Sequence, residues 1–456
     1  MRREKKPVNI DLTEGKPSSV LLRYCLPLFG SVIFQQLYNI ADTFVAGNFI
    51  SENAIAAVGN SYEITLIFIA IAFGCNIGCS VIVSNYFGAK NYRDMKTSVY
   101  TSFIAGGVIC VLLVVFGTIF CDNLLELINT KTEIFADSKI YLDIYIWSFP
   151  FVFFYNIATG IFAAFGDSKT PFWFLACSST ANIGGDIFAV TVLGMGVDGL
   201  AWATFICQGI SCVLAMIFIF KRLSAFETSE KSRIFSWKIL GHISVVAVPS
   251  MLQQSFISVG NLVIQAIVNI FPVAVTAGFA SATKLNNFVI TSLSTFSNGI
   301  SNYAGQNIGA GKTERTRKGF GASFRIIICI TIPASLLYVL LSGILPNIFI
   351  TNPSGLALES AASFLKIVAP FYTLISVKMI ADGILRGARM MKKFMISTFT
   401  DLLLRVLLAY LLSQTSLGYN GIWMAWPIGW TIGTIVSVVF YKTIKWDKLS
   451  ETGILR

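Results

Sequence analysis

The stretch TSVYTSFIAGGVICVLLVVFGTIF (residues 97–120) decides the fold, because no Asp, Glu, Lys or Arg interrupts it. A helix that crosses a membrane needs about 20 predominantly apolar residues, whereas the strands of a membrane barrel alternate over roughly ten residues. Similar apolar stretches recur along the chain and are separated by short polar breaks. The sequence therefore predicts an all-α polytopic membrane protein.

Composition supports this prediction over the full 456 residues, of which 55% are hydrophobic and 12% are charged. Soluble globular chains carry about 25% charged residues, so this chain is unusually poor in charge. We expect twelve transmembrane helices, with approximate bounds 20–46, 54–86, 97–120, 137–165, 171–193, 197–221, 237–269, 274–305, 318–345, 357–385, 393–413 and 418–442.

The positions of the basic residues predict the orientation. Most of the 34 Lys and Arg residues lie in alternate polar breaks, among them 90–96, 221–238 and 386–393. Cytoplasmic loops are enriched in Lys and Arg, so we expect both termini in the cytoplasm. The same bias accounts for the formal net charge of +11 without a nucleic-acid partner.

The chain repeats itself, which predicts two related lobes. Four motifs of the first half recur in order, at nearly one offset, in the second half: Gln35-Gln36 with Gln253-Gln254, Gly88-Ala89 with Gly309-Ala310, Gly160-Ile161 with Gly383-Ile384, and Gly196–Gly199 with Gly418–Gly421. Six spans per half give the halves parallel topology, related by an axis along the membrane normal. The predicted parts are a cytoplasmic N-terminal tail (1–19), an N-lobe (20–221), a cytoplasmic linker (222–236), a C-lobe (237–442) and a cytoplasmic C-terminal tail (443–456).

Two carboxyl groups inside predicted spans are candidate cation ligands. Asp42 lies in the first span, Asp186 lies in the fifth with Asn182 one turn earlier, and Thr204 lies in the sixth. A charged side chain at mid-membrane costs roughly 2.5–3.5 kcal/mol on insertion scales, so each needs a partner or a function. Carboxylate, amide and hydroxyl oxygens suit a small cation, and two carboxyl groups in one dry pocket also suit a proton. The alternative is that the two carboxyl groups are separate, each bonded to local backbone or water.

Other residues in the spans are candidates for the lining of a substrate cavity. Lys284 lies midway along the eighth span with no acidic neighbour in the sequence, and aromatic faces attract organic cations. We expect the cavity among Tyr38, Tyr141, Met251, Lys284, Asn287 and Phe288.

Three further features of the spans concern packing and motion. Lys378 with Asp382, and Asp401 with Arg405, are i,i+4 pairs of opposite charge, which predicts local ion pairs with a structural role. Pro27 removes a backbone donor inside the first span and predicts a bend there. That bend is either static or a gating hinge in the helix that carries Asp42.

Enzymes and nucleotide-binding proteins need residues that this chain lacks. GAGKT at 309–313 has Gln306 where a phosphate loop requires glycine, and with His242 as its only histidine the chain lacks a base for a catalytic triad. The nine cysteines contain no C-x-x-C pair, so zinc-type spacing is absent. We expect a monomer that is not an enzyme, with no cofactor and no metal ion other than a coupling Na⁺.

Four motifs resemble the multidrug and toxic compound extrusion (MATE) family: QQLYNIADTFVAG (35–47), YFGAKNYRDMK (86–96), GDSKTP (166–171) and QNIGAGK (306–312). The likeness extends from about residue 20 to residue 442. It implies twelve helices and export of organic cations in exchange for H⁺ or Na⁺. In one bacterial branch the cation site matches Asp42, Asn182, Asp186 and Thr204, and the helix-1 proline that bends matches Pro27.

The chain also departs from family patterns in its second half. Another branch has acidic cation ligands on helices 7 and 10, where this chain has Gln253, Gln254 and Ile375. An arginine common after helix 4 is replaced by Ala163, whereas Arg386 keeps the corresponding place in the second half. A C-lobe cation site of that kind is therefore not expected.

The sequence favours a cation-coupled antiporter of the bacterial cytoplasmic membrane that exports amphiphilic or cationic compounds by alternating access. A lipid-linked oligosaccharide flippase of the same superfamily is one alternative, although such a protein often has more spans and a basic cavity. An integral-membrane enzyme is a second alternative, but it would require a clustered catalytic set near one membrane face.

Overall fold

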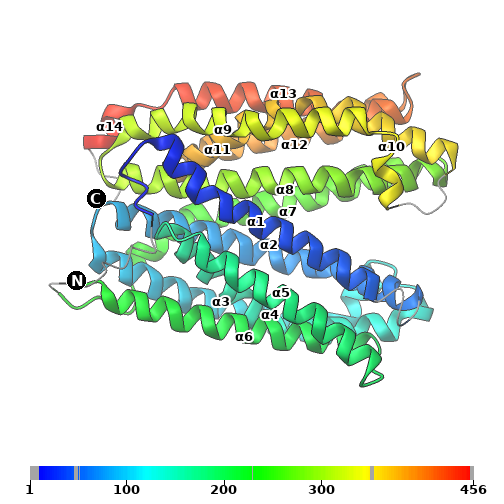
Figure 1. Cartoon of the computed structure of the whole chain (residues 1–456), viewed down its shortest axis with the longest axis horizontal. Helices are drawn as coiled ribbons and strands as arrows, with labels where there is room; N and C mark the ends of the chain where they lie inside the picture. Colours follow the sequence, from blue (N-terminus) through cyan, green and yellow to red (C-terminus); the bar gives the residue numbers. More distant parts are fainter. Residues whose placement is uncertain (1–9, 46–49, 51, 229, 350–353, 452–456) are drawn as a thin grey trace, which may run out of the picture. The chain divides into compact units, whose positions relative to one another are not determined.

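The computed structural model describes residues 10–45, 50, 52–228, 230–349 and 354–451, without the side chains of residues 38–45, 52, 53, 55, 63, 448, 450 and 451. Within these ranges the chain is made of helices (Figure 1). It forms two compact units: unit 1 comprises Met1–Asp11 and Leu26–Gln254, and unit 2 comprises Leu12–Cys25 and Ser255–Arg456. Each unit is described by itself.

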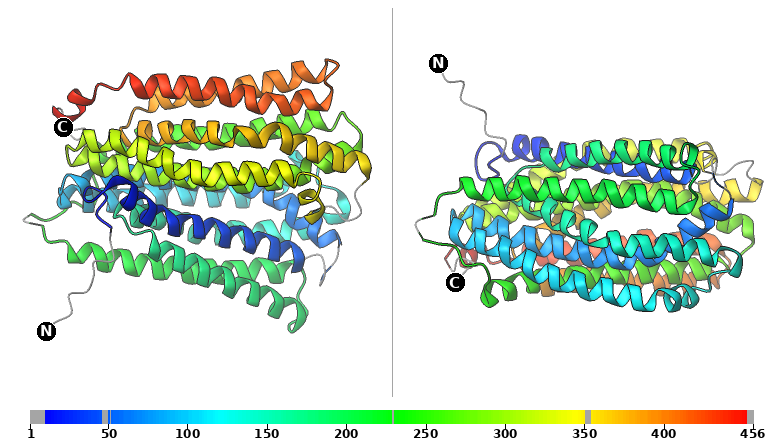
Figure 2. Two further views of the ribbon diagram at one scale, coloured as in Figure 1. Left: turned by 45° about the horizontal axis from the view of Figure 1, so that its top comes forward. Right: turned by 90° about the horizontal axis from the view of Figure 1, so that it is seen from below.

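Unit 1 is a helical bundle in which α4 packs against α2, α3 and α6, and α5 pairs with α6. Its helices run side by side in both views of Figure 2. It takes the larger part of α1 (Pro17–Val45) and the first part of α7 (Trp237–Val268), together with α2 (Glu52–Gly88), α3 (Tyr92–Leu127), α4 (Thr132–Ala164), α5 (Lys169–Thr191) and α6 (Val197–Ala225).

Unit 2 has the same plan, with α11 packed against α8, α9 and α13, and α12 paired with α13. The tenth predicted span is broken at Pro370 into α10, η3 and α11. The elements are α8 (Val273–Gly309), α9 (Thr313–Leu340), η2 (Leu345–Ile348), α10 (Gly355–Val368), η3 (Ala369–Phe371), α11 (Tyr372–Gly387), α12 (Met391–Ser413), α13 (Tyr419–Lys442) and α14 (Trp446–Glu451).

The predicted repeat is confirmed by the order and packing of the helices, and two pairs also match in length. Helices α2 and α8 both have 37 residues, and helices α5 and α12 both have 23 residues. The packing repeats as well, because a Cβ on Gly160 would lie 2.9 Å from the carbonyl oxygen of Asn76, and a Cβ on Gly383 would lie 2.6 Å from that of Ser297. The two halves therefore share close helix contacts as well as hydropathy.

The units exchange the beginnings of their first helices. Leu12–Cys25 packs within unit 2, although the rest of α1 belongs to unit 1. The Leu12 side chain is fully buried, its amide donates to Gln306 Oε1 at 3.2 Å, and its carbonyl accepts from Asn307 Nδ2 at 3.0 Å. Arg315 donates to the carbonyl oxygens of Glu14 and Gly15. In return, the first part of α7 packs within unit 1.

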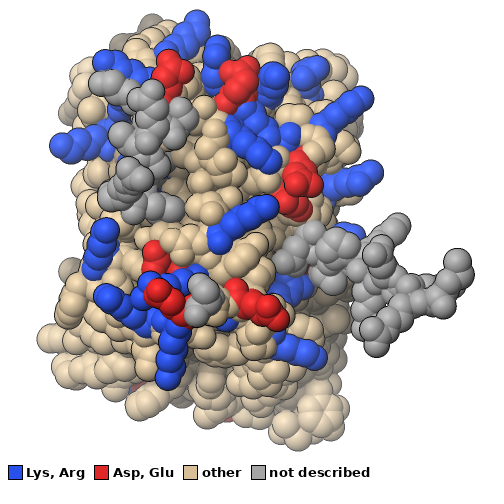
Figure 3. All heavy atoms as spheres, turned by 90° about the vertical axis from the view of Figure 1, so that its left-hand side faces the viewer, with Lys and Arg blue, Asp and Glu red and all other residues tan. Residues whose placement is uncertain are grey.

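The surface of the bundle fits lipid along the helices and water at their ends. Apolar side chains on α3 such as Val111, Leu112 and Ile119 are more than 60% exposed. Figure 3 shows a face at the helix ends on which Lys and Arg side chains are numerous and Asp and Glu are fewer. Among the described residues, ten helices are long and apolar enough to cross a membrane. Helices α5 and α8 are also long but more polar, and both carry candidate site residues.

Candidate functional site

The predicted cation site lies on α5 and α6 of unit 1, where small residues let the two helices approach closely. A Cβ on Gly185 would lie 3.3 Å from the Cβ of Ala203, so a larger residue at 185 would push α5 away from α6. A Cβ on the neighbouring Gly184 would meet no atom within 4 Å. Gly185 is therefore packed against α6, whereas the space beside Gly184 is open.

Three of the four predicted ligands are buried beside this approach. Asn182 Nδ2 donates to Thr204 Oγ1 at 3.3 Å, which links α5 to α6. Asp186 lies one helical turn after Asn182 and is 1% exposed. No described residue donates a hydrogen bond to Asn182 Oδ1. The structure thus gathers an amide oxygen, a hydroxyl and a carboxyl group on one helix pair.

This arrangement suits a small cation or a proton. Hard cations prefer carboxylate, amide and hydroxyl oxygens, which are the groups present. A buried amide oxygen that lacks a donor can accept an ion or a water molecule without losing a hydrogen bond. A buried carboxyl group in an apolar bundle can be neutralised by a bound cation or by a proton. These observations leave the choice of ion open.

The fourth predicted ligand, Asp42, and the predicted cavity residue Tyr38 lie on α1, but their side chains are outside the described residues. The described part of α1 includes Pro27, whose carbonyl oxygen accepts from Ser31 Oγ at 3.1 Å. The chain passes from unit 2 to unit 1 between Cys25 and Leu26, beside this proline. A proline also lies inside the corresponding helix of the second half, since α7 carries Pro249.

The predicted cavity residues on unit 1 lie in helix contacts. Tyr141 packs against Val190 and Leu200, and its ring stacks with that of Tyr145. Met251 lies where α7 touches α2, because a Cβ on Gly74 would lie 2.7 Å from the Met251 backbone nitrogen. Both residues therefore fill space between helices.

The predicted cavity residues on unit 2 lie on one exposed stretch of α8. Lys284, Asn287 and Phe288 are all exposed, and the Lys284 ammonium lies 5.4 Å from the centre of the Phe349 ring. Their neighbour Asn286 is buried and accepts from Tyr372 Oη at 3.2 Å. Their assignment to a cavity lining stays a prediction.

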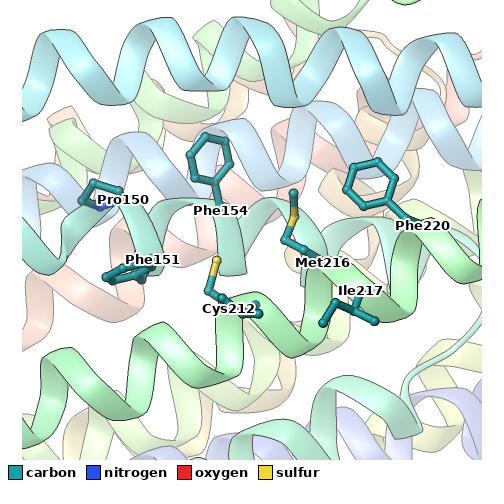
Figure 4. A pocket seen from close by; sticks show the side chains of 8 residues that line it. Pro150, Phe151, Phe154, Cys212, Met216, Ile217 and Phe220 are labelled. Carbon is teal, nitrogen blue, oxygen red and sulfur yellow. The ribbon is translucent and has the colours of Figure 1, made fainter.

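An apolar groove of about 620 Å³ lies between α4 and α6 of unit 1 (Figure 4). Its walls include Pro150, Phe151, Phe154, Met216 and Phe220, and none of the predicted cavity residues lines it. Ligand sites usually add a few polar groups that orient the ligand, and this lining has no charged side chain. The groove alone therefore gives no reason to place a cationic substrate there.

The two predicted ion pairs of the C-lobe differ from each other. Lys378 Nζ lies 2.8 Å from Asp382 Oδ2, as expected for an i,i+4 pair. The nearest described basic nitrogen to Asp401 belongs to Lys378, at 3.8 Å, whereas the Arg405 guanidinium lies over the Trp426 ring at 5.5 Å. Asp401 and Arg405 attract each other, but no nitrogen of Arg405 lies within 4 Å of Asp401, so the predicted close i,i+4 pair is not formed and α11 supplies the nearer cation.

Sequence reasoning missed the residues around these charges. Ser437 Oγ donates to Asp382 Oδ1 at 2.6 Å and also hydrogen-bonds Ser397. Their signal was present in the sequence, since Gly429, Gly433 and Ser437 are spaced at i, i+4 and i+8 and so form one small-residue stripe on α13.

Two repeated helical bundles with buried polar groups define a multi-pass membrane transporter fold. The MatE family model matches residues 27–188 and again 249–411, so it finds the same repeat. These matches cover most of the chain, and the chain belongs to the MatE family.

Relatives of this chain extend over nearly its whole length. It is 25% identical over 96% of its length to the probable multidrug resistance protein YpnP of Bacillus subtilis, covering 98% of that protein. It is 23% identical to a FAD transporter of Shewanella oneidensis, covering 90% of this chain and 91% of that one. A solved outward-facing multidrug resistance MATE family transporter matches with a TM-score of 0.89 at 22% identity, over 98% of this chain and 100% of that chain, which supports the fold.

Proposed function

We propose that this protein is a cation-coupled antiporter that exports amphiphilic, often cationic, organic compounds in exchange for H⁺ or Na⁺. The observation that carries the proposal is the buried group of Asn182, Asp186 and Thr204 on α5 and α6. A buried carboxylate with neutral oxygen ligands is stabilised when a small exchangeable cation binds to it. Asp42 is the proposed fourth ligand, supplied by α1.

The gating step of the proposal places Pro27 at a hinge. Because this proline lies beside the point where α1 passes between the units, a bend there would move the helix that carries Asp42. Substituting Pro27 with alanine restores a backbone donor and should stiffen α1. We expect P27A to insert and fold normally but to transport more slowly, whereas unchanged transport would remove Pro27 from the mechanism.

The cargo class is supported by the names of relatives. YpnP is called a probable multidrug resistance protein, and the exposed aromatic and polar residues of α8 could receive an amphiphilic cation. The Shewanella relative is called a FAD transporter, which makes an anionic flavin nucleotide the second candidate cargo.

Transport by the purified protein in lipid vesicles tests both the coupling ion and the cargo. A Na⁺ gradient and a pH gradient are imposed separately, with a fluorescent organic cation in one set of vesicles and a flavin nucleotide in another. We expect one of the two gradients to drive accumulation of the organic cation, and the D186N protein to serve as the inactive control. Movement of cargo with neither gradient would contradict cation coupling.

We also propose that the protein acts as a monomer in the cytoplasmic membrane of a bacterium, with both termini inside. The basic residues in alternate polar breaks support this orientation. Fusion of alkaline phosphatase after residue 456 should give an inactive reporter, because this enzyme needs an oxidising compartment for its disulfides. An active phosphatase fusion would invert the topology.

A further inference from the structure

The stripe of small residues on α13 makes room for charged side chains of unit 2. A Cβ on Gly433 would lie 2.9 Å from Asp401 Cβ and 3.0 Å from Lys378 Cε. A Cβ on Gly429 would lie 3.1 Å from Asp401 Oδ1. An alanine at either position would crowd the charged groups, so the two glycines hold open the space that these groups occupy.

The Lys378 ammonium lies between two carboxylates from different helices. It is 2.8 Å from Asp382 Oδ2 on α11 and 3.8 Å from Asp401 Oδ2 on α12. All three residues are at most 6% exposed. The second oxygen of Asp382 accepts from Ser437 on α13. One positive charge thus lies among oxygens that three helices contribute.

The Lys378 ammonium is the one described basic group within 4 Å of Asp401. The Oδ1 atom of Asp401 has no hydrogen-bond partner among the described residues, although its side chain is only 9% exposed. Arg405 follows one turn later on α12, but its guanidinium lies over Trp426. Arg386, the other buried basic residue nearby on α11, donates to Ser297 Oγ at 2.7 Å. Lys378 is therefore the described base that lies closest to both carboxylates.

The repeat gives the contact between Arg405 and Trp426, one turn from Asp401, the place that the contact between Asn182 and Thr204 has in unit 1. When α5 is aligned with α12 and α6 with α13, Trp426 takes the place of Thr204, and Arg405 stands one position beyond the place of Asn182. Both pairs are in contact across the matching helix pair, one by a hydrogen bond and the other by a cation–π contact. At this place unit 1 thus has an amide and a hydroxyl group, whereas unit 2 has the guanidinium of Arg405, with the Lys378 ammonium near Asp401 of the same helix.

We propose that Lys378 is a tethered cation: its ammonium occupies a monovalent-cation site formed by Asp382 and Asp401, which would otherwise bind an exchangeable Na⁺ or proton. Two carboxylates with neighbouring hydroxyl groups are oxygen ligands of the kind that hard cations prefer. Without the Lys378 ammonium, neither buried carboxylate would have a described basic nitrogen within 4 Å. The consequence for the exchange cycle, which rests on the proposed function, is that unit 2 contributes no exchangeable ion.

The substitution K378M tests this site directly. Methionine reproduces the lysine chain as far as Cε and leaves the position of the ammonium empty. The purified full-length protein is used in the D186N background, which removes the proposed cation site of unit 1. Its melting temperature is measured in NaCl, KCl and choline chloride at equal ionic strength, and again in choline chloride as the pH is lowered.

We expect D186N/K378M to melt at least about 2 °C higher in NaCl, or at lower pH, than in choline chloride at neutral pH, because a ligand that binds only the folded state stabilises it. The Na⁺ and pH series distinguish the two occupants. The D186N parent and the matched D186N/K284M variant, which loses an exposed lysine of α8, should show no such gain. Adding D382N should abolish the gain, because one of the two carboxylates is then neutral.

Two results would overturn the proposal. The first is a melting temperature of D186N/K378M that is the same in all salts and at every pH. The second is a K378M protein that cannot be recovered in any salt while K378M/D382N folds, since a true cation site should be rescued by a cation. Neither result depends on transport, so failure of the tethered cation and failure of the proposed antiport can be told apart.

Discussion

The helix pair α5–α6 of unit 1 and the helix pair α12–α13 of unit 2 occupy corresponding places in the repeat but differ in charge. On α5 the buried Asp186 lies one turn after Asn182, which donates to Thr204 of α6. On α12 the buried Asp401 is held near Lys378, and Arg405 follows it. A duplicated bundle can thus keep its packing while the buried polar and charged groups of its two copies diverge.

The largest expected effect is the loss of Asp186. The substitution D186N keeps the size of the side chain but removes its charge, so cation-driven efflux should fall to the background of empty vesicles. Efflux of a fluorescent organic cation from reconstituted vesicles measures this, with the melting temperature as a check on folding. Normal efflux by D186N would place the coupling ion elsewhere and remove the contrast between the units.

Loss of Asp382 should affect stability most. The substitution D382N removes the 2.8 Å partner of a buried ammonium, and breaking a buried pair costs about 3–5 kcal/mol. Thermal unfolding in detergent should show a large fall in melting temperature. The double variant K378M/D382N is the matched control and should recover part of the loss, because the ammonium and its 2.8 Å partner are removed together and the Asp401 carboxylate remains. Equal stability of D382N and the parent would mean that the ammonium does not need Asp382.

A pair of glycine substitutions compares the packing of the two sites. The added methyl group of G433A meets Asp401 and Lys378 at about 3 Å, and overpacking of this kind costs about 1–3 kcal/mol. The added methyl group of G184A, on α5, meets no atom within 4 Å, and alanine favours a helix. We expect G433A to melt at a lower temperature and G184A to melt at the same or a higher temperature. A destabilised G184A would mean that the open side of α5 is filled.

The smallest effect concerns the hydrogen bond between α5 and α6. The substitution T204V keeps the shape of the side chain and removes the hydroxyl that accepts from Asn182. One hydrogen bond contributes about 0.5–1.5 kcal/mol to ion binding. The concentration of coupling ion that gives half-maximal transport should therefore rise by at most about tenfold. Transport assayed over a series of ion concentrations measures the shift, and an unchanged requirement would exclude Thr204 as a ligand.

The sequence predicted the helices and the repeat well, because hydropathy and motif spacing are local signals. The twelve predicted spans are present as helices, and the order of the four repeated motifs agrees with the order of the helices that carry them. The exchange of the first parts of α1 and α7 was not predicted, since both are ordinary apolar segments in the sequence. Only their tertiary contacts distinguish them.

The candidate site was predicted only in part, because some of its contacts join helices that are far apart in the sequence. Asn182 and Thr204 come together as the resemblance implied, because each lies on the buried face of its own helix. The cluster around Lys378 could not be read from i,i+4 spacing, because its decisive contacts join α11, α12 and α13. The side chain of Asp42 lies outside the described residues, so its place in the site stays a prediction.

The burial of Leu12 among residues of unit 2 has a consequence for biosynthesis. Leu12 is synthesised long before Asn307 and Arg315, which both donate to its carbonyl oxygen. At about 5–20 residues per second, synthesis of the intervening chain takes on the order of 15–60 s. During that interval the start of the protein must wait at the membrane surface without its final partners. A chaperone or insertase that shields this segment would therefore act before the second half of the protein exists.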